Sequence, residues 1–278
     1  MSMTRGFDRV GQEIQVLAIL LVVWAGGPGV APAADAAESA SPVLVELFTA
    51  EGCSSCPPAD TFLRQLDASQ PIPGAELIVL GEHVDYWDGQ GWPDPYSSAS
   101  LTERQRAYVR TLRLREAYTP QFIVDGASEM RLSERQKIAQ VLKAAAAAPK
   151  IPVEIDTLKI EPGSPAFATG TIAVDGGAER HSSDVYLGLA LDHYESKVLR
   201  GENRGQLLSH VAILLDLVKL GSLPPGQKTA QAFRVALKPG VDPGNLRVIG
   251  FVQESDHGKV VGAALKHTAT APLVPESR

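Results

Sequence analysis

The chain lacks an excess of basic residues: 26 Lys and Arg stand against 32 Asp and Glu, which leaves a net charge of −6. Nucleic-acid binding requires a basic surface, so this balance argues against such a partner. After residue 33 no apolar run is long enough to form a membrane-spanning helix. Internal repeats and long runs of like charge are also absent from the sequence. We therefore expect no further membrane segment and no nucleic-acid partner.

A short apolar run near the N-terminus predicts a signal peptide over residues 1–33. Arg5 and Arg9 precede the apolar residues 16–25, and Ala31-Pro-Ala33 provides the small residues of a cleavage site. The run of about ten residues falls short of the roughly 20 that a transmembrane helix needs. An uncleaved anchor is the alternative. Cleavage predicts a periplasmic or secreted protein, in a compartment where disulfides persist.

The rest of the chain divides into two regions with different patterns. Residues 41–148 alternate strand-like and helix-like stretches, which predicts a mixed sheet with flanking helices. The strands expected there are residues 43–48, 76–84 and 121–124, and the expected helices are residues 59–68, 101–112 and 133–148. After the Pro-rich residues 149–152, short β-rich runs predict an all-β, sandwich-like domain over residues 151–270. Residues 206–220 fit either a helix or a strand.

The only two cysteines, Cys53 and Cys56, follow the first predicted strand and precede a predicted helix. A Cys-x-x-Cys at this position is typical of a dithiol/disulfide redox site, because two intervening residues bring the sulfurs within bonding reach. The helix N-terminus stabilises a thiolate, whereas the nearby Glu51 disfavours it. We assign Cys53 as the attacking thiol and Cys56 as the resolving thiol. Two prolines after Cys56 suit the first helical turn.

Two other uses of the cysteines stay open. A structural disulfide that closes a four-residue loop would contribute only about 2 kcal/mol in the chain-entropy model, which is a weak staple. A copper- or zinc-binding protein could use Cys53, Cys56 and His83, since thiolates suit Cu(I). However, Met130 is the only methionine after the predicted signal, and a structural zinc site needs four ligands. We therefore expect no resident metal or cofactor.

The dithiol segment resembles the glutaredoxin segment of the thioredoxin-like superfamily. More specifically, it is similar to an uncharacterised secreted family whose pattern is V-E-L-F-T-x-x-G-C-S-S-C-P-P-A-D, followed by H-V-D-Y-W-D, T-E-R-Q-R-x-Y and Y-T-P-Q. The match runs through most of residues 43–126 and extends to residues 201–210. This resemblance implies a thioredoxin-like α/β domain before the sandwich-like domain, but it implies no substrate. The Ser-Ser pair differs from the inner residues of thioredoxin, so the direction of electron flow does not follow from it.

Thr119-Pro120 resembles the X-Pro turn of that superfamily, in which the proline is cis and faces the dithiol. A cis proline lacks an N–H and leaves a backbone edge open, where a partner peptide could pair. We therefore assign Thr119 and Pro120 to substrate positioning. The alternative is an ordinary proline at the start of a strand.

Three further polar residues are candidates for tuning the dithiol. Glu46 lies in an apolar strand and could act as a proton relay, or it could point to solvent. His83 and Asp85 flank a strand end with i, i+2 spacing, which would place them on one face as a pair near a thiol. The alternative is a hydrogen bond that shapes the aromatic loop, residues 85–96.

The second half offers weaker signals and leaves three functions to weigh. Residues 202–205 with His210 fit a polar site, or turn and capping residues. The first functional hypothesis is an exported thiol:disulfide oxidoreductase that acts on protein thiols or disulfides. The rivals are a periplasmic copper-binding or copper-delivery protein and a non-catalytic interaction module.

Overall fold

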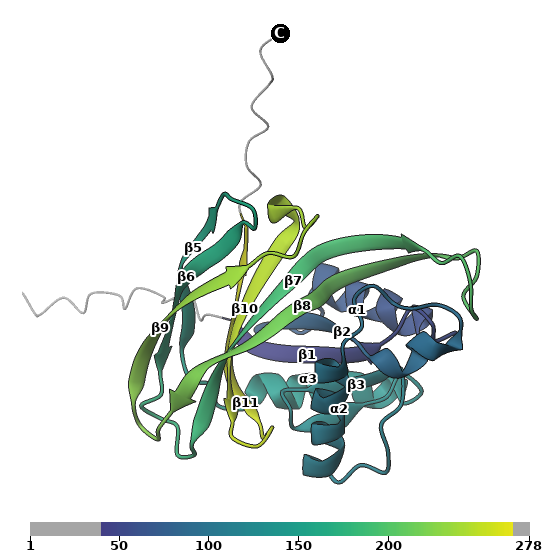
Figure 1. The fold of residues 1–278 in the computed structure, drawn as a ribbon. Helices are drawn as coiled ribbons and strands as arrows, with labels where there is room; N and C mark the ends of the chain where they lie inside the picture. Colours follow the sequence, from purple (N-terminus) through teal and green to yellow (C-terminus); the bar gives the residue numbers. More distant parts are fainter. Residues whose placement is uncertain (1–39, 269–278) are drawn as a thin grey trace, which may run out of the picture. The chain divides into compact units, whose positions relative to one another are not determined.

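The computed structural model describes residues 40–268, all within one compact unit. The predicted signal peptide lies outside the described residues. A mixed eight-stranded sheet has the order β11-β10-β7-β8-β2-β1-β3-β4, and a three-stranded sheet has the order β5-β6-β9 (Figure 1). The strands of the large sheet are β1 (Ser41–Thr49), β2 (Ala75–His83), β3 (Gln121–Val124), β4 (Ser128–Met130), β7 (Ser183–Lys197), β8 (Leu207–Leu223), β10 (Leu246–Glu254) and β11 (Val260–His267). The small sheet contains β5 (Val153–Glu161), β6 (Phe167–Asp175) and β9 (Lys228–Ala236), and the helices are α1 (Pro57–Ser69), α2 (Ala99–Thr111), α3 (Arg135–Ala147), η1 (Asp85–Gln90) and η2 (Pro243–Asn245).

Successive side chains of β1 contact helices on opposite faces of the large sheet. Val45 and Leu47 belong to an apolar cluster with residues of α1 and α3. Leu44, one position out of phase, belongs to a different cluster that includes Leu101 of α2. Successive side chains of a strand point to opposite faces, so β1 is buried on both sides. Strand β1 pairs in parallel with β2, so the C-terminal ends of both strands lie at the same edge of the sheet.

The fold class predicted from the sequence is wrong. We expected a thioredoxin-like α/β domain followed by a separate all-β sandwich, but strands from both regions form one continuous sheet and the described residues are mostly β. The junction is a parallel pairing of Gly81 in β2 with Ile213 in β8. A Cβ on Gly81 would lie 3.2 Å from the Val211 carbonyl oxygen, so glycine permits this close approach. The ambiguous residues 206–220 belong to a strand.

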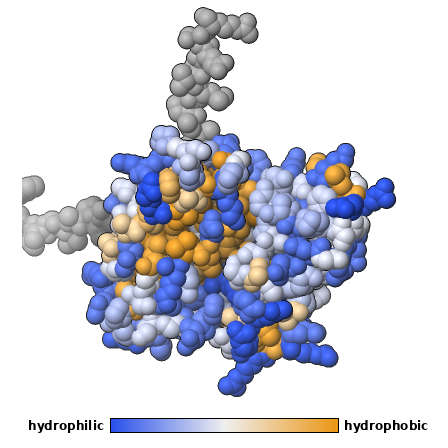
Figure 2. Space-filling view, in the orientation of Figure 1, coloured by the Kyte–Doolittle hydropathy of each residue, from blue (hydrophilic) through white to orange (hydrophobic). Residues whose placement is uncertain are grey.

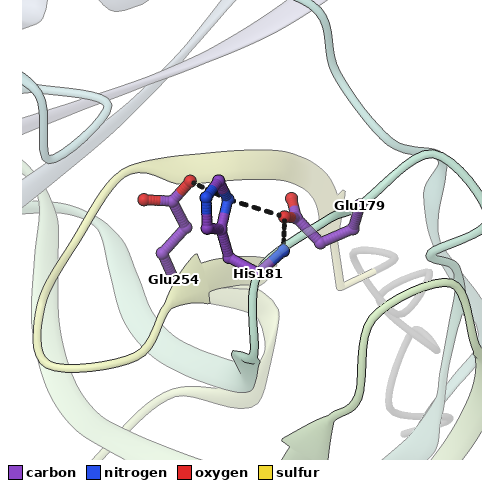
Figure 3. A group of neighbouring side chains, drawn as sticks. All are labelled: Glu179, His181 and Glu254. Atoms are coloured by element: carbon purple, nitrogen blue, oxygen red, sulfur yellow. Dashed lines mark hydrogen bonds and ion pairs between the residues drawn. The ribbon is translucent and has the colours of Figure 1, made fainter.

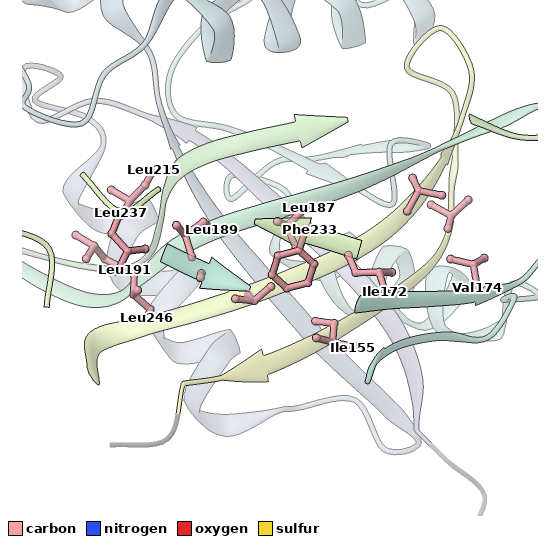
Figure 4. Packing of buried hydrophobic residues seen from close by; sticks show 14 of the residues in the cluster. Ile155, Ile172, Val174, Leu187, Leu189, Leu191, Leu215, Phe233, Leu237 and Leu246 are labelled. Atoms are coloured by element: carbon pink, nitrogen blue, oxygen red, sulfur yellow. The ribbon is translucent and has the colours of Figure 1, made fainter. Parts of the chain in front are cut away.

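The small sheet packs on the part of the large sheet that follows residue 182. Phe233 and Ile172 of the small sheet share a buried cluster with Leu187 and Leu189 of β7 and with Leu246 of β10 (Figure 4). Face-to-face sheets bury alternate residues in this way. The two-layer β arrangement is therefore present, although its second layer is the end of the same large sheet.

One face of the molecule carries an apolar area near its centre, bordered by hydrophilic side chains (Figure 2). Among residues 40–268, no helix is long and apolar enough to cross a membrane.

Candidate dithiol site

Cys53 and Cys56 form a disulfide with a Cα–Cα distance of 5.5 Å, at the edge of the sheet where β1 ends. Cys56 is the N-cap residue of α1, and prolines occupy the first two helical positions, as expected from the sequence. The Cys56 carbonyl oxygen accepts hydrogen bonds from the N–H groups of Ala59 and Asp60 at 2.8 and 3.1 Å. The pair thus lies in the first turn of a helix, where the helix dipole favours a thiolate.

Both cysteines are completely buried, whereas the intervening Ser54 and Ser55 are exposed. The Ser55 hydroxyl lies 3.3 Å from the Cys53 sulfur and 3.5 Å from the Thr119 carbonyl oxygen, to which it donates. Exchange with another thiol requires access to a sulfur atom. The loop must therefore open before the disulfide can react.

The tip of the β7–β8 hairpin, residues 198–206, closes over the dithiol loop. Asn203 is completely buried, and its side-chain amide donates to the carbonyl oxygens of Glu51 and Cys53, both at 2.9 Å. The Ser54 N–H donates to Glu202 Oε2 at 3.2 Å. For residues 202–205 we expected either a polar site or turn and capping residues. Glu202 and Asn203 act as capping residues, because their side chains bind backbone groups of the loop that carries the cysteines.

The aromatic loop, residues 85–96, covers the dithiol loop from another side. The Trp87 indole N–H donates to Thr119 Oγ1 at 2.8 Å, and the Trp92 indole N–H donates to Glu51 Oε2 at 2.6 Å. A Cβ on Gly52 would lie 3.2 Å from the Trp87 Cβ, so glycine allows the loop to pack closely. Two indoles, each anchored by a hydrogen bond, therefore enclose the loop.

The Thr119–Pro120 peptide bond is cis, as predicted. Pro120 lines a surface cavity of about 430 Å³ together with Leu114, Tyr118 and Leu132. The hydrogen bond from Ser55 to the Thr119 carbonyl places this cavity's edge beside the dithiol loop. The structure thus brings together the two cysteines and the two residues assigned to substrate positioning.

Glu46 does not point to solvent; it is completely buried in an ion pair. Arg104 Nη2 lies 2.6 Å from Glu46 Oε1, and the Tyr108 hydroxyl donates to Glu46 Oε2 at 2.7 Å. Arg104 also donates to Gln253 Oε1 at 3.1 Å, which ties α2 to β10. The proton-relay role for Glu46 stays a prediction, but its immediate partners are the residues of this buried network.

A second buried carboxyl, Glu82, borders the Glu46–Arg104 pair. Burial raises the pKa of Glu82 well above its usual value, and the charge of Glu46 raises it further, while Arg104 opposes the rise. Arg104 Nε lies 3.6 Å from Glu82 Oε1, which is too long for a hydrogen bond. Two adjacent buried carboxylates repel each other, so this environment favours the neutral form of Glu82.

His83 and Asp85 do not form the predicted pair. His83 Nδ1 lies 2.7 Å from Asp94 Oδ2, whereas Asp85 Oδ1 accepts a hydrogen bond from Thr102 Oγ1 at 2.6 Å. The physical reason is that β2 ends at His83 and the 3₁₀-helix η1 begins at Asp85, so the i, i+2 geometry of a strand does not continue. Burial lowers the pKa of His83, but the charge and hydrogen bond of Asp94 outweigh this and raise it to about 8.

Histidines and carboxylates also gather under the dithiol loop. His210 of β8 lies between Glu51 and Asp60: its Nε2 is 4.0 Å from Glu51 Oε1 and its Nδ1 is 3.7 Å from Asp60 Oδ1. The ring centroids of His210 and His83 are 5.0 Å apart. The sequence analysis noted His210 but missed Asp60 and Asp94. A signal for Asp60 was its place four residues after Cys56 on the helix that carries the dithiol.

Within residues 40–268, one group of side chains is spaced so that its atoms could share a metal ion: Glu179, His181 and Glu254 (Figure 3). His181 Nδ1 lies 3.3 Å from Glu179 Oε1 and 3.2 Å from Glu254 Oε1. Glu179 Oε1 already accepts the N–H groups of Arg180 and His181, and the imidazole is 70% exposed. These contacts are those of a turn whose backbone N–H groups are bound by the Glu179 carboxylate.

Comparisons with known proteins agree with the resemblance to an uncharacterised family. A family model described as a protein of unknown function (DUF1223) matches residues 44–253. A protein of Agrobacterium tumefaciens has a similar structure at 24% identity, with a TM-score of 0.63 over 85% of this chain and 97% of its own. HBP35 of Porphyromonas gingivalis aligns at 16% identity, with a TM-score of 0.59 over 86% of this chain and 79% of its own. Such identities indicate a shared fold alone, and no curated protein matches the chain.

Proposed function

The chain belongs to the DUF1223 family, whose function is unknown, and we propose from its own residues that it is a thiol:disulfide oxidoreductase. The observation that carries the proposal is the Cys53–Cys56 disulfide in the first turn of α1, beside the Thr119–Pro120 turn whose Thr119 carbonyl accepts from Ser55. A disulfide over four residues adds only about 2 kcal/mol of stability in the chain-entropy model. The pair is therefore better suited to exchange than to stapling.

The proposed reaction begins when a thiolate of a client protein attacks the Cys53 sulfur. A bond forms between the client sulfur and Cys53, and the Cys53–Cys56 bond breaks with its electron pair on the Cys56 sulfur. A second client thiolate then attacks the client sulfur of this mixed disulfide and releases Cys53 as a thiolate. The client dithiol is oxidised to a disulfide, and the disulfide of this chain is reduced to a dithiol. The reverse sequence reduces a client disulfide.

Two features favour Cys53 as the sulfur that is attacked. It follows the sheet edge directly and contacts the exposed Ser55 hydroxyl, whereas Cys56 is held by its carbonyl hydrogen bonds to the first turn of α1. The cavity beside Pro120 borders the same loop and offers a place for the client chain. We also place the reaction in an exported compartment, on the strength of the sequence pattern in residues 1–33.

Trapping of mixed disulfides tests the proposal. The Cys56→Ala variant keeps Cys53 and should form an adduct with a cysteine-containing peptide disulfide, detected as a mass increase under non-reducing conditions. The matched Cys53→Ala variant keeps the other thiol and should form far less adduct. Equal labelling of both variants, or none, would contradict the assigned roles.

The rival copper function has a distinct outcome in the same preparation. Cys53, Cys56 and His83 would hold Cu(I) only after reduction of the disulfide. Retention of one Cu(I) per reduced wild-type chain, together with no peptide adduct of Cys56→Ala, would replace the exchange proposal by metal binding.

A further inference from the structure

Five titratable side chains lie buried together beneath the dithiol loop. They come from the loop after β1, from α1, β2, the loop before α2, and β8: Glu51, Asp60, His83, Asp94 and His210, each at most 6% exposed. Burial of so many ionisable groups is costly unless they are paired. Their arrangement, rather than their number, indicates what they do.

Both ring nitrogens of His210 are buried polar atoms without a hydrogen-bond partner in the part of the chain that the structure describes. Among the same residues, Glu51 Oε1 also forms no hydrogen bond. The two nitrogens face Asp60 and Glu51 at 3.7 and 4.0 Å, slightly beyond hydrogen-bond distance. Gaps of this size are closed by a small side-chain movement or by a bridging water. His210 is therefore placed to exchange a proton with a carboxylate on either side.

The group connects to the dithiol through α1. Cys56 has helical backbone angles, and Asp60 follows it by four residues, so both side chains lie on the same side of the first turns. The Asp60 N–H also donates to the Cys56 carbonyl oxygen at 3.1 Å. Both sulfurs are completely buried, so a thiolate formed on Cys56 is shielded from solvent, and Asp60 is the first ionisable side chain of α1 after it.

We propose that His210 carries the proton of the Cys53–Cys56 couple and delivers it through Asp60 to the Cys56 sulfur when the disulfide is reduced. This inference rests on the proposed thiol exchange. When a thiolate attacks Cys53 and the disulfide bond breaks, the electron pair goes to the Cys56 sulfur. His210 gives up its proton, Asp60 passes one on, and Cys56 becomes a neutral thiol. Reoxidation returns the proton to His210.

Two other buried candidates, His83 and Glu46, are held by charged partners, although within residues 40–268 His83 Nε2 forms no hydrogen bond. His83 is fixed by Asp94, whose own pKa falls to about 2 because the His83 charge and several hydrogen bonds outweigh its burial. Glu46 is paired with Arg104. The charged groups that face His210 are Glu51, Asp60 and the His83–Asp94 pair. From the neighbouring strand β7, the titratable Tyr194 lies opposite His210 in the pairing register.

The test is the pH dependence of disulfide reduction in the full chain. The rate constant for reduction by dithiothreitol is measured from pH 5 to 9 and divided by the thiolate fraction of the reagent. For the wild type, the corrected rate should fall as pH rises, because fewer molecules then carry a proton that can be delivered to Cys56. His210→Asn should lower the acidic plateau by at least about tenfold and remove this fall, since general acid catalysis contributes about 10²–10⁴-fold. His193→Asn changes an exposed histidine of β7 and should leave the profile unchanged.

A second variant covers the case in which His210→Asn does not fold. Asp60→Asn keeps the side-chain shape but cannot pass a proton on, so it should also lower the acidic plateau of the corrected rate by at least about tenfold. A His210→Asn profile like that of the wild type, or an Asp60→Asn plateau as high as that of the wild type, would overturn the proton-carrying role. A wild type that is not reduced and forms no adducts would instead overturn the proposed function itself.

Discussion

Asn203 is the side chain whose removal should most directly open the dithiol loop. It is completely buried and donates two hydrogen bonds to carbonyl oxygens of the loop, those of Glu51 and Cys53. In Asn203→Ala the Glu51 carbonyl loses its partner in the closed state, whereas in the open state water solvates it; the Cys53 carbonyl keeps the hydrogen bond from the Cys56 N–H at 3.2 Å. Leaving buried polar groups unsatisfied costs about 1–3 kcal/mol. The closed state should be destabilised by that amount relative to the open state.

This free energy converts directly into reactivity. The buried disulfide reacts only from the open state, so its reduction rate follows the population of that state. At 1.4 kcal/mol per factor of ten, the Asn203→Ala rate constant for reduction by dithiothreitol should rise roughly 5- to 100-fold. The assay is quenched thiol labelling followed by mass spectrometry. Hydrogen exchange at the Ser54 amide, which donates to Glu202, should accelerate in parallel, while the amide of Val79 in β2 should stay protected.

Arg204→Ala is the matched control for this experiment. Arg204 is exposed in the same turn of the hairpin tip, so its removal leaves the hydrogen bonds of Asn203 in place. It should react at the wild-type rate. If Asn203→Ala is reduced no faster than Arg204→Ala, the hairpin tip does not control access to the disulfide and the reasoning fails.

Three other perturbations have defined outcomes. Arg104→Met leaves the Glu46 charge buried without its partner and should lower the free energy of urea unfolding by about 3–5 kcal/mol; a loss below about 1 kcal/mol would mean that this ion pair contributes little to stability. Gly52→Ala presses a Cβ onto the aromatic loop and should cost about 1–3 kcal/mol in the same assay, and an unchanged midpoint would show that the loop yields. The pKa of His83 is raised from 6.5 to about 8, so the stability from its pairing is full below pH 6.5 and is lost as pH rises through 8, a decrease of about 2 kcal/mol. Asp94→Asn should remove that pH dependence, and a variant that keeps it would assign the dependence to another group.

Several helices and strands before residue 150 could be predicted well, because their apolar spacing and turn residues lie within short stretches of the sequence. The strands expected at residues 43–48 and 76–84 correspond to β1 and β2, and the helices expected at residues 59–68 and 101–112 correspond to α1 and α2 within a few positions. The turn with Pro120 was also predicted, from a three-residue motif. Each of these depends on neighbours in the chain.

Strand β8 shows why the longer-range features were missed. Its 17 residues face three different clusters: Ile213 packs with the small sheet, Ala212 with α1 and α3, and Leu214 with the α2 side. Ala212 has a positive φ of 51°, and the pairing with β7 shifts register twice, so the two-residue alternation is interrupted. The apolar spacing that remains resembles that of a helix. Only Gly81, a glycine inside a predicted strand, indicated that another backbone approaches there.

The same long-range pairing explains which site residues the sequence could not place. The cysteines and Pro120 were found because short motifs contain them. Asn203 and His210 were expected in a polar site or as turn and capping residues, but they reach the dithiol only because β8 lies beside β2. The dithiol is therefore not a property of residues 41–148 alone. The hairpin tip that closes over Cys53 and the histidine beneath it both come from the second half of the chain. A fragment that ends before β7 would keep both cysteines but lose the side chain that closes the loop and the side chain proposed to carry its proton.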